Sequence, residues 1–346
     1  MPLAELGVIE HLEQTGSKVA VRLGLHAASE RLQRQLRERI EDALKGSGVD
    51  GIGVDFSLRV PMRPAAGDDP VPQVKNVVLV MSGKGGVGKS TTAVNLTLAL
   101  QKRGLRVGLL DADIYGPSIP TMLGINGHPQ SADGKTIEPL SRFGVKLMSI
   151  GFMIENEKDA IIWRGPMLQS ALMQFLSDVK WGELDFLLLD LPPGTGDVAL
   201  SLAQKVKSTG AVIVTTPQEV ALQDVYKSVS MCKKLNIPLL GVVENMSFFI
   251  DSAGVKHEIF GAGGGEKIAE FAEAPLLGQV PLDASVRQWG DGGTPIVQAA
   301  PEHPCSLAFL SVADALCEKI AKDSFVRGGG KKAPDETAPR RLKILR

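Results

Sequence analysis

The chain has 346 residues, of which 44% are hydrophobic, and a formal net charge of −1. This length suffices for one large or two ordinary domains, and the near-neutral charge gives no field that would attract nucleic acid. Its three cysteines form no C-x-x-C pair, which argues against a disulfide framework and favours the reducing cytoplasm. We find no leader-like segment in residues 1–16, and no apolar run reaches the ~18 residues of a membrane span.

Residues 1–60 predict a small α/β domain. Alternating polar and apolar residues predict half-buried strands over 18–25 and 52–60. Between them, residues 29–44 carry an apolar stripe at helical spacing, and Ser29 is a suitable N-cap for that helix.

Residues 61–74 and 75–322 differ in composition. Four prolines, two consecutive aspartates and small residues predict an exposed linker over the first segment. In the second, short apolar runs alternate with helical patterns, which predicts a mostly parallel sheet with helices on both faces. The expected strands are 77–81, 107–110, 186–189, 211–214, 239–243 and 276–280, the expected helices are 91–102, 167–176, 220–235 and 306–320, and residues 136–152 include a candidate β-hairpin.

Residues 323–346 are poor in apolar side chains and rich in glycine and basic residues, which predicts a disordered basic tail. Its end, 340–346, is basic and partly apolar. A solvated tail is the favoured interpretation, and a short helix on a membrane surface is the alternative.

The most informative motif is G-x-x-x-x-G-K-[ST], which lies between the first strand and the first helix of the large domain. Its glycines let backbone N–H groups approach phosphate oxygens, and the following helix adds positive potential. We expect Lys89 to reach the β- and γ-phosphates of ATP, and the Ser90 hydroxyl to hold Mg²⁺. The predicted nucleotide-binding residues are Gly83, Lys84, Gly85, Gly86, Val87, Gly88, Lys89, Ser90 and Thr91. The motif predicts an α/β fold of the P-loop NTPase type and an ATPase.

Carboxylates follow two of the predicted strands, at the edge where an open α/β sheet binds ligands. Asp190 stands in the Walker-B arrangement, so we expect it to hold Mg²⁺ directly or through water. Asp113 lies in a loop two residues after Asp111, where it can orient the attacking water. A turn or cap residue is the alternative for each aspartate.

Two further residues are candidates for nucleotide contact. Lys84 is a second lysine in a loop that needs one, and we predict that it neutralises transition-state charge in a facing subunit. It can instead contact its own nucleotide or solvent. Asn245 follows a strand, and its amide can both donate to and accept from adenine, although asparagine is also common in turns there. The predicted catalytic residues are Lys84, Lys89, Asp113 and Asp190.

Together these motifs resemble the MinD/ParA group of deviant Walker-A ATPases and, within it, the Mrp (ApbC-like) iron–sulfur cluster carriers. The resemblance covers about residues 75–321. The segments that carry it are 82–92, 111–118, 163–167, 190–197, 241–247 and 259–265. The N-terminal part is similar to the small assembly-factor domain that often precedes these ATPases in bacteria.

The resemblance implies a cytoplasmic ATP-sandwich homodimer with Lys84 acting across the interface. It further implies that the protein delivers iron–sulfur clusters to client apoproteins together with assembly factors, and that a C-x-x-C pair after the Asn-Met-Ser motif bridges the cluster between subunits. At those two positions the chain has Asp251 and Gly254. Thiolates are the usual ligands of such clusters, and glycine offers no side-chain ligand. No cluster ligand is therefore identifiable in the sequence.

The remaining candidates for metal binding have simpler interpretations. We expect Cys232, Cys305 and Cys317 to lie in helices as small buried residues. His257 lies near the missing pair and can ligate a metal, although an exposed loop histidine is the favoured interpretation.

Three functions fit the motifs. The favoured one is an ATP-dependent iron–sulfur cluster carrier or assembly factor. The second is a MinD/ParA-like spatial or regulatory switch without a cluster. The third is a scaffold that binds ATP, dimerises and engages assembly partners without holding a cluster.

Overall fold

The computed structural model describes residues 8–65, 67–113, 116–153, 165–196, 200–202 and 205–327 of the chain. The chain divides into two compact units, one formed by residues 1–61 and 317–346 and the other by residues 62–316. Each unit is described by itself.

The first unit contains a three-stranded sheet, a helix that connects two of its strands, and the C-terminal part of α11 (Pro304–Arg327). Its elements are β1 (Ile9–Thr15), β2 (Lys18–Leu25), α2 (Glu30–Leu44) and β3 (Gly51–Leu58), and the sheet order is β1-β2-β3. Strands β2 and β3 pair in parallel, as expected when a helix connects them, whereas β1 pairs antiparallel to β2. Ser29 caps α2 as predicted, because its Oγ accepts a hydrogen bond of 3.2 Å from the Leu32 N–H.

The strands over 18–25 and 52–60 and the helix over 29–44 are confirmed within one or two residues, but the sequence analysis missed β1. The side chains of β2 alternate between exposed and buried, whereas most of β1 is exposed. An exposed edge strand such as β1, with sequence Ile-Glu-His-Leu-Glu-Gln-Thr, has no continuous apolar face to reveal it.

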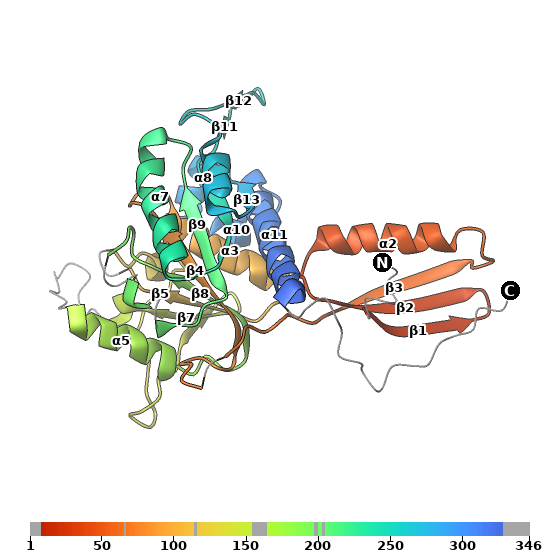
Figure 1. Ribbon diagram of the computed structural model, residues 1–346, viewed down its shortest axis with the longest axis horizontal. Helices are drawn as coiled ribbons and strands as arrows, with labels where there is room; N and C mark the ends of the chain where they lie inside the picture. The colour runs from red at the N-terminus through yellow and green to blue at the C-terminus, as the bar shows by residue number, and fades with distance from the viewer. Residues whose placement is uncertain are drawn as a thin grey trace. The chain divides into compact units, whose positions relative to one another are not determined.

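The second unit is built on an eight-stranded sheet of order β13-β10-β9-β4-β8-β5-β7-β6 (Figure 1). All neighbouring strands are parallel except the β6–β7 pair. The strands are β4 (Val74–Ser82), β5 (Val107–Asp111), β6 (Leu140–Arg142), β7 (Val145–Ser149), β8 (Leu184–Asp190), β9 (Gly210–Thr215), β10 (Leu239–Glu244) and β13 (Leu276–Gln279). The predicted parallel sheet and the predicted hairpin within 136–152 are both confirmed.

Helices cover both faces of this sheet. The chain crosses from β4 to β5 in one direction along the sheet and from β9 to β10 in the other, so right-handed crossovers place α3 and α7 on opposite faces (Figure 1). The helical segments are α3 (Lys89–Lys102), α4 (Ile119–Met122), the 3₁₀ turn η1 (Ile150–Met153), α5 (Gly165–Ser177), α7 (Glu219–Lys234), α8 (Gly264–Ala272), α9 (Ala284–Asp291), α10 (Ile296–Ala299) and α11 (Pro304–Arg327). Strands β5, β8 and β9 are buried along their whole length, which explains their continuous apolar sequences.

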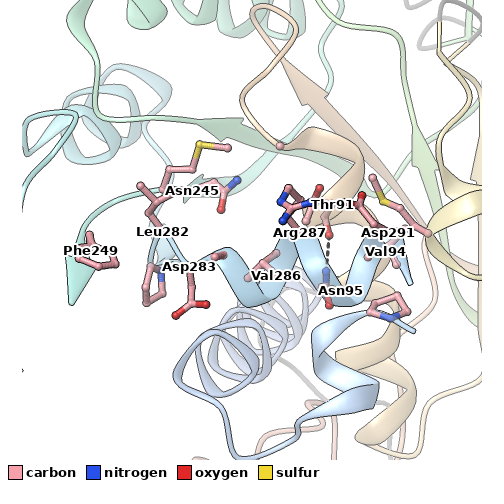
Figure 2. Close-up of a pocket in the computed structure, with 17 residues that line it drawn as sticks. Thr91, Val94, Asn95, Asn245, Phe249, Leu282, Asp283, Val286, Arg287 and Asp291 are labelled. Carbon is pink, nitrogen blue, oxygen red and sulfur yellow. Dashed lines mark hydrogen bonds and ion pairs between the residues drawn. The ribbon is translucent and has the colours of Figure 1, made fainter. Parts of the chain in front are cut away.

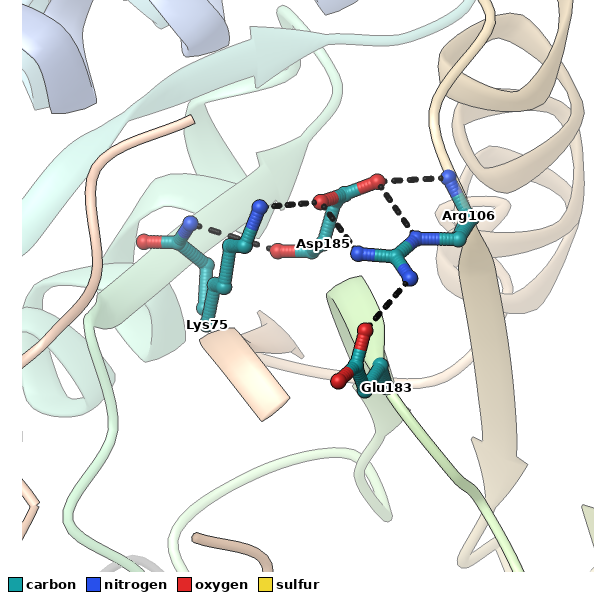
Figure 3. Close-up of polar contacts among 5 residues, drawn as sticks. Lys75, Arg106, Glu183 and Asp185 are labelled. Carbon is teal, nitrogen blue, oxygen red and sulfur yellow. Dashed lines mark hydrogen bonds and ion pairs between the residues drawn. The ribbon is translucent and has the colours of Figure 1, made fainter. Parts of the chain in front are cut away.

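A polar network ties together the amino ends of three central strands (Figure 3). The carboxylate of Asp185 in β8 accepts hydrogen bonds from Lys75 Nζ in β4 at 2.8 Å and from the backbone N–H of Arg106, just before β5, at 2.9 Å. The Arg106 guanidinium also reaches Glu183 at 2.9 Å. Burial favours the neutral acid, but hydrogen bonds from Lys75 and Arg106 lower the pKa of Asp185 below its ordinary value. The network fixes the relative position of β4, β5 and β8 on the side opposite the P-loop.

Two segments differ from their sequence-based expectations. Within the predicted linker, Arg63 is buried, pairs with Asp69 and donates to the carbonyl of Lys207 at 3.0 Å, so this segment is a packed part of the second unit. Helix α11 continues to Arg327, beyond the start of the predicted disordered tail, and residues 328–346 lie outside the described residues. Within the described ranges, no helix combines the length and the apolar character that a membrane crossing requires.

Candidate nucleotide-binding site

The P-loop joins β4 to α3 at the carboxyl edge of the sheet, in the strand–loop–helix context that the motif predicts. Gly88, the residue before α3, has φ +80°, and a Cβ there would collide with the amide of Asn245. A Cβ at Gly83 would collide with the backbone of Val225. The loop therefore requires glycine at these positions, and it leaves the first N–H groups of α3 free to bind an anion.

Four predicted site residues gather beneath the loop. Lys89 Nζ lies 2.7 Å from Asp190 Oδ1 and 3.4 Å from Asp113 Oδ2. Ser90 Oγ donates a hydrogen bond of 2.5 Å to Asp190 Oδ2. The side chains of Lys89 and Asp190 are 6% and 0% exposed, so their charges are screened little by solvent.

Sheet register explains why these groups meet. Asp111 at the end of β5 pairs with Asp190 at the end of β8, and β8 lies next to β4, which leads into the P-loop. Asp111 is fully buried; it accepts hydrogen bonds from the Ser149 hydroxyl at 2.9 Å and from the Asp113 N–H at 3.1 Å. Asp111 thereby positions Asp113, a role that the sequence analysis did not assign to it. The spacing Asp-Ala-Asp at a strand end was the available signal.

Three aspartates, Asp111, Asp113 and Asp190, lie close to a single lysine, Lys89, so their negative charges are not fully balanced. Burial, and then the charge of Asp190, raise the pKa of Asp111 to about 7. Burial also raises the pKa of Asp190, although Lys89 and Ser90 oppose this effect. A hydroxyl and a carboxylate beside a phosphate loop are hard oxygen donors, so Ser90 and Asp190 fit Mg²⁺. The site is suited to receive a cation together with a polyphosphate.

The other two candidates lie at the edge of the loop. Lys84 is partly exposed, and its backbone carbonyl accepts a hydrogen bond of 3.0 Å from Ser82 Oγ. Asn245 is buried, and its side-chain amide donates to the carbonyl of Val87 at 2.9 Å. One edge of the Asn245 amide thus braces the P-loop. Whether the side chain also contacts a base stays a prediction.

A largely apolar cavity of about 640 Å³ opens beside the P-loop (Figure 2). It is bordered by Gly88 of the loop, by α3 and by α9, and Asn245 lies along its upper side in the view. The other lining residues include Thr91, Val94 and Asn95 of α3, Val286, Arg287 and Asp291 of α9, and Phe249 of the short strand β11 (Phe249–Ile250). The volume suits a small organic group. Sequence reasoning missed α9, for which Asp283 as an N-cap was the available signal.

A short exposed hairpin occupies the place where the resemblance predicts two cysteines. It consists of β11 (Phe249–Ile250) and β12 (Lys256–His257). Asp251 Oδ2 lies 2.7 Å from His257 Nε2, and Gly254 adopts φ +79° in the turn. The hydrogen bond with His257 lowers the pKa of Asp251. The hairpin is therefore closed by a carboxylate–imidazole contact.

The three cysteines of the chain are all buried and form no disulfide, as predicted. Cys232 lies in α7, whereas Cys305 and Cys317 lie in α11. Burial raises the pKa of Cys232 to about 12, so its thiol stays protonated. Three segments quoted for the resemblance fall partly outside the described residues, at positions 114–115, 163–164 and 197.

Fold and site together define a P-loop NTPase of the ParA/MinD type. The same fold occurs in the cell division ATPase MinD of Pyrococcus furiosus, with a TM-score of 0.53, 24% identity, and coverage of 71% of this chain and 98% of that one. A nucleotide-binding protein from Archaeoglobus fulgidus, solved in complex with ADP, is more similar in sequence, with a TM-score of 0.59, 37% identity, and coverage of 68% and 93%.

The particular family follows from the sequence comparisons. Residues 73–317 match the NUBPL iron-transfer P-loop NTPases of the ParA group. The chain is 54% identical over 255 residues to an iron–sulfur cluster carrier protein of Aquifex aeolicus, covering 72% of this chain and 69% of that protein. It is 43% identical over 332 residues to a protein of the same name from Synechocystis, covering 94% of each. The chain therefore belongs to the NUBPL iron-transfer P-loop NTPases of the ParA group. The resemblance that its motifs indicated is confirmed.

Proposed function

We propose that this NTPase is an iron–sulfur cluster carrier that binds and hydrolyses ATP. The observation that carries the ATPase part is the convergence of Lys89, Ser90, Asp113 and Asp190 beneath a glycine-rich loop. Lys89 binds the β- and γ-phosphates, and Asp113 orients the attacking water. Ser90 and Asp190 hold Mg²⁺, which when bound neutralises charge on the phosphate oxygens.

The base and ribose of ATP take the cavity beside the loop. Its mostly apolar wall suits a planar ring, and Asn245 offers polar contacts at its edge. Gly88 and Thr91 border both the cavity and the phosphate loop, so one ligand can occupy the two regions at once.

Two copies of the chain close around two ATP molecules in the proposed mechanism. Lys84 lies at the partly exposed edge of its P-loop, where its amine can reach a facing subunit. There it neutralises charge that develops as the γ-phosphoryl group transfers, as an arginine finger does. Hydrolysis then opens the dimer and releases the cargo.

The proposed cargo is an iron–sulfur cluster, which the protein delivers to client apoproteins with the help of assembly factors. Support comes from the named relatives, which match most of this chain. We propose the cytoplasm as its location, because cysteines that form no disulfide are typical of a reducing compartment. The three cysteines lie buried in helices, and the hairpin of Asp251 and Gly254 carries no thiol where the resemblance implies two, so we expect other molecules to supply some or all cluster ligands.

Anaerobic reconstitution tests the cargo. The full chain is incubated with iron and sulfide, with and without ATP, and then desalted. A carrier retains iron and sulfide in equal amounts, at a ratio fixed by the dimer, and shows charge-transfer absorbance. A chain that stays free of iron, alone and with added glutathione as a source of thiolates, contradicts cluster carriage.

The burial of all three cysteines favours one alternative, a MinD/ParA-like switch that controls binding to a membrane or a protein without a cluster. This function predicts that ATP drives binding of the full chain to anionic vesicles, and that removal of residues 340–346 abolishes it. Sedimentation with vesicles in ATP and in ADP distinguishes the two functions, because a carrier needs no such difference.

A further inference from the structure

Three side chains with different donor atoms gather at the start of α9 and α11. The ligand atoms of Asp283, His303 and Cys305 all lie within 4.8 Å of one another. Asp283 is the N-cap of α9, and His303 and Cys305 flank Pro304, the first residue of α11. A carboxylate, an imidazole and a thiol at such separations can reach a single metal ion after small side-chain movements.

The surroundings suit an ion that enters from solvent. Cys305 is fully buried, and its Sγ lies 3.7 Å from the carbonyl oxygen of Pro281. The side chains of His303 and Asp283 are 25% and 34% exposed. The group therefore has one donor fixed in the interior and two at the surface, which leaves a route for exchange.

Helix capping accounts for part of this arrangement. One carboxylate oxygen of Asp283 accepts from the Ser285 N–H at 2.7 Å, and His303 Nδ1 accepts from the Cys305 N–H at 3.2 Å. Capping uses one atom of each side chain. It does not require that Asp283 Oδ2 and His303 Nε2 face each other at 3.7 Å, or that a thiol lies beside them.

Metal binding has a defined cost here. A neutral imidazole has one N–H, so coordination through either ring nitrogen releases the contact between His303 Nδ1 and the Cys305 N–H. At 3.2 Å this is a long hydrogen bond, and it lies in the first turn of a helix, where water can replace it. The thiol also gives its proton to solvent when its sulfur binds the ion.

We propose that Asp283, His303 and Cys305 bind one borderline-soft divalent metal ion of the Zn²⁺ and Fe²⁺ class. Sulfur and imidazole donors favour such ions over Mg²⁺. Three protein ligands leave a fourth position for water or for a ligand from another molecule. This site is separate from Ser90 and Asp190, and it does not depend on whether the protein carries clusters. Asp283 also borders the cavity of Figure 2, so the ion lies next to the nucleotide site.

Cobalt titration tests the site. The full chain is freed of metal with a chelator and titrated with Co²⁺ in excess Mg²⁺ and ADP, which occupy the oxygen donors at the P-loop. We expect one equivalent of Co²⁺ to bind with a thiolate-to-cobalt absorption band, and Zn²⁺ to displace it. The Cys305→Ser variant should lose the band. Asp283→Asn and His303→Asn should bind about 10-fold or more weakly, while asparagine still caps each helix.

Cys232→Ser is the matched control, because it removes a buried cysteine outside the group. It should keep the band. Circular dichroism shows whether each variant folds, and a given concentration of Zn²⁺ should raise the melting temperature of the unmodified chain more than that of Asp283→Asn. A titration without a thiolate band overturns the proposal, as does equal affinity in the chain and all three variants, or loss of the band in Cys232→Ser.

Discussion

Lys89 Nζ forms an ion pair of 2.7 Å with Asp190 Oδ1 beneath the P-loop, and both side chains are nearly inaccessible to solvent. Lys89, the proposed phosphate ligand, thus contacts Asp190, the proposed ligand of Mg²⁺. In the proposed mechanism this contact would be lost when ATP and Mg²⁺ bind. Lys89 would then pair with the phosphates, and Asp190 would hold the metal. Binding of either one alone leaves a buried charge without its partner, so the two should bind together.

Lys89→Ala tests the phosphate assignment. Loss of the ammonium removes charge-assisted hydrogen bonds to the β- and γ-phosphates, and we expect ATP affinity to fall by at least about 100-fold. Equilibrium titration with a fluorescent ATP analogue measures the change. Lys102→Ala, at the exposed end of the same helix, is the control and should bind normally. Comparable ATP affinities of the two variants would exclude the proposed role.

Lys84→Ala tests action between subunits. ATP affinity should change little, because the amine serves the neighbouring site, but hydrolysis should fall about 10³-fold if Lys84 replaces an arginine finger. A mixture with Asp113→Ala sharpens the experiment. Each mixed dimer has one site with both groups intact, so mixing the two inactive variants should restore about one quarter of the turnover. If the mixture remains as inactive as its components, Lys84 does not act across an interface.

The sequence predicted the parts of the molecule whose local signals agree with their tertiary surroundings. Uninterrupted apolar runs marked the buried strands of the large sheet, and the glycine spacing of residues 83–90 marked the P-loop. The gathering of Lys89, Asp113 and Asp190 followed from the P-loop motif and from the positions of the two aspartates at or just after strand ends. By contrast, β1 has a mostly exposed sequence, and the cavity wall depends on α9, which comes to line the same cavity as α3 only in the folded chain. The role of Asp111 in positioning Asp113 likewise depends on the register between β5 and β8, which places Asp111 opposite Asp190.

Asp113→Asn tests the assignment of the attacking water. Asp113 Oδ2 lies 3.4 Å from Lys89 Nζ, whereas Asp190 accepts the hydrogen bond from the Ser90 hydroxyl. We therefore expect single-turnover hydrolysis to slow by about 10²- to 10⁴-fold, the range of general acid–base effects, with ATP affinity nearly unchanged. Rapid-quench assays at saturating ATP and direct binding measurements separate the two quantities. A large loss of Mg²⁺-dependent affinity would instead assign Asp113 to the metal.

Asp185→Asn tests the network of Figure 3. The pKa of Asp185 in the folded chain is lowered below the ordinary value of 3.8. A lowered pKa means that the ionised carboxylate stabilises the fold above that value and that this stabilisation is lost as the pH falls. The free energy of unfolding at pH 7 should therefore be lower in the variant by about 1–3 kcal/mol, because the buried side chain at position 185 no longer offers a negative charge to Lys75 and Arg106.

Urea denaturation between neutral and acidic pH measures this effect. The difference between the unmodified chain and Asp185→Asn should begin to shrink as the pH falls below 3.8, and it should vanish below the lowered pKa of the folded chain, where both carry a neutral group. Glu183→Gln is the matched control. Glu183 contacts the same Arg106, but its side chain is 80% exposed, so the variant should change stability by less than about 1 kcal/mol. A constant difference at all pH values would mean that Asp185 acts through hydrogen-bond geometry alone, without a contribution from its charge.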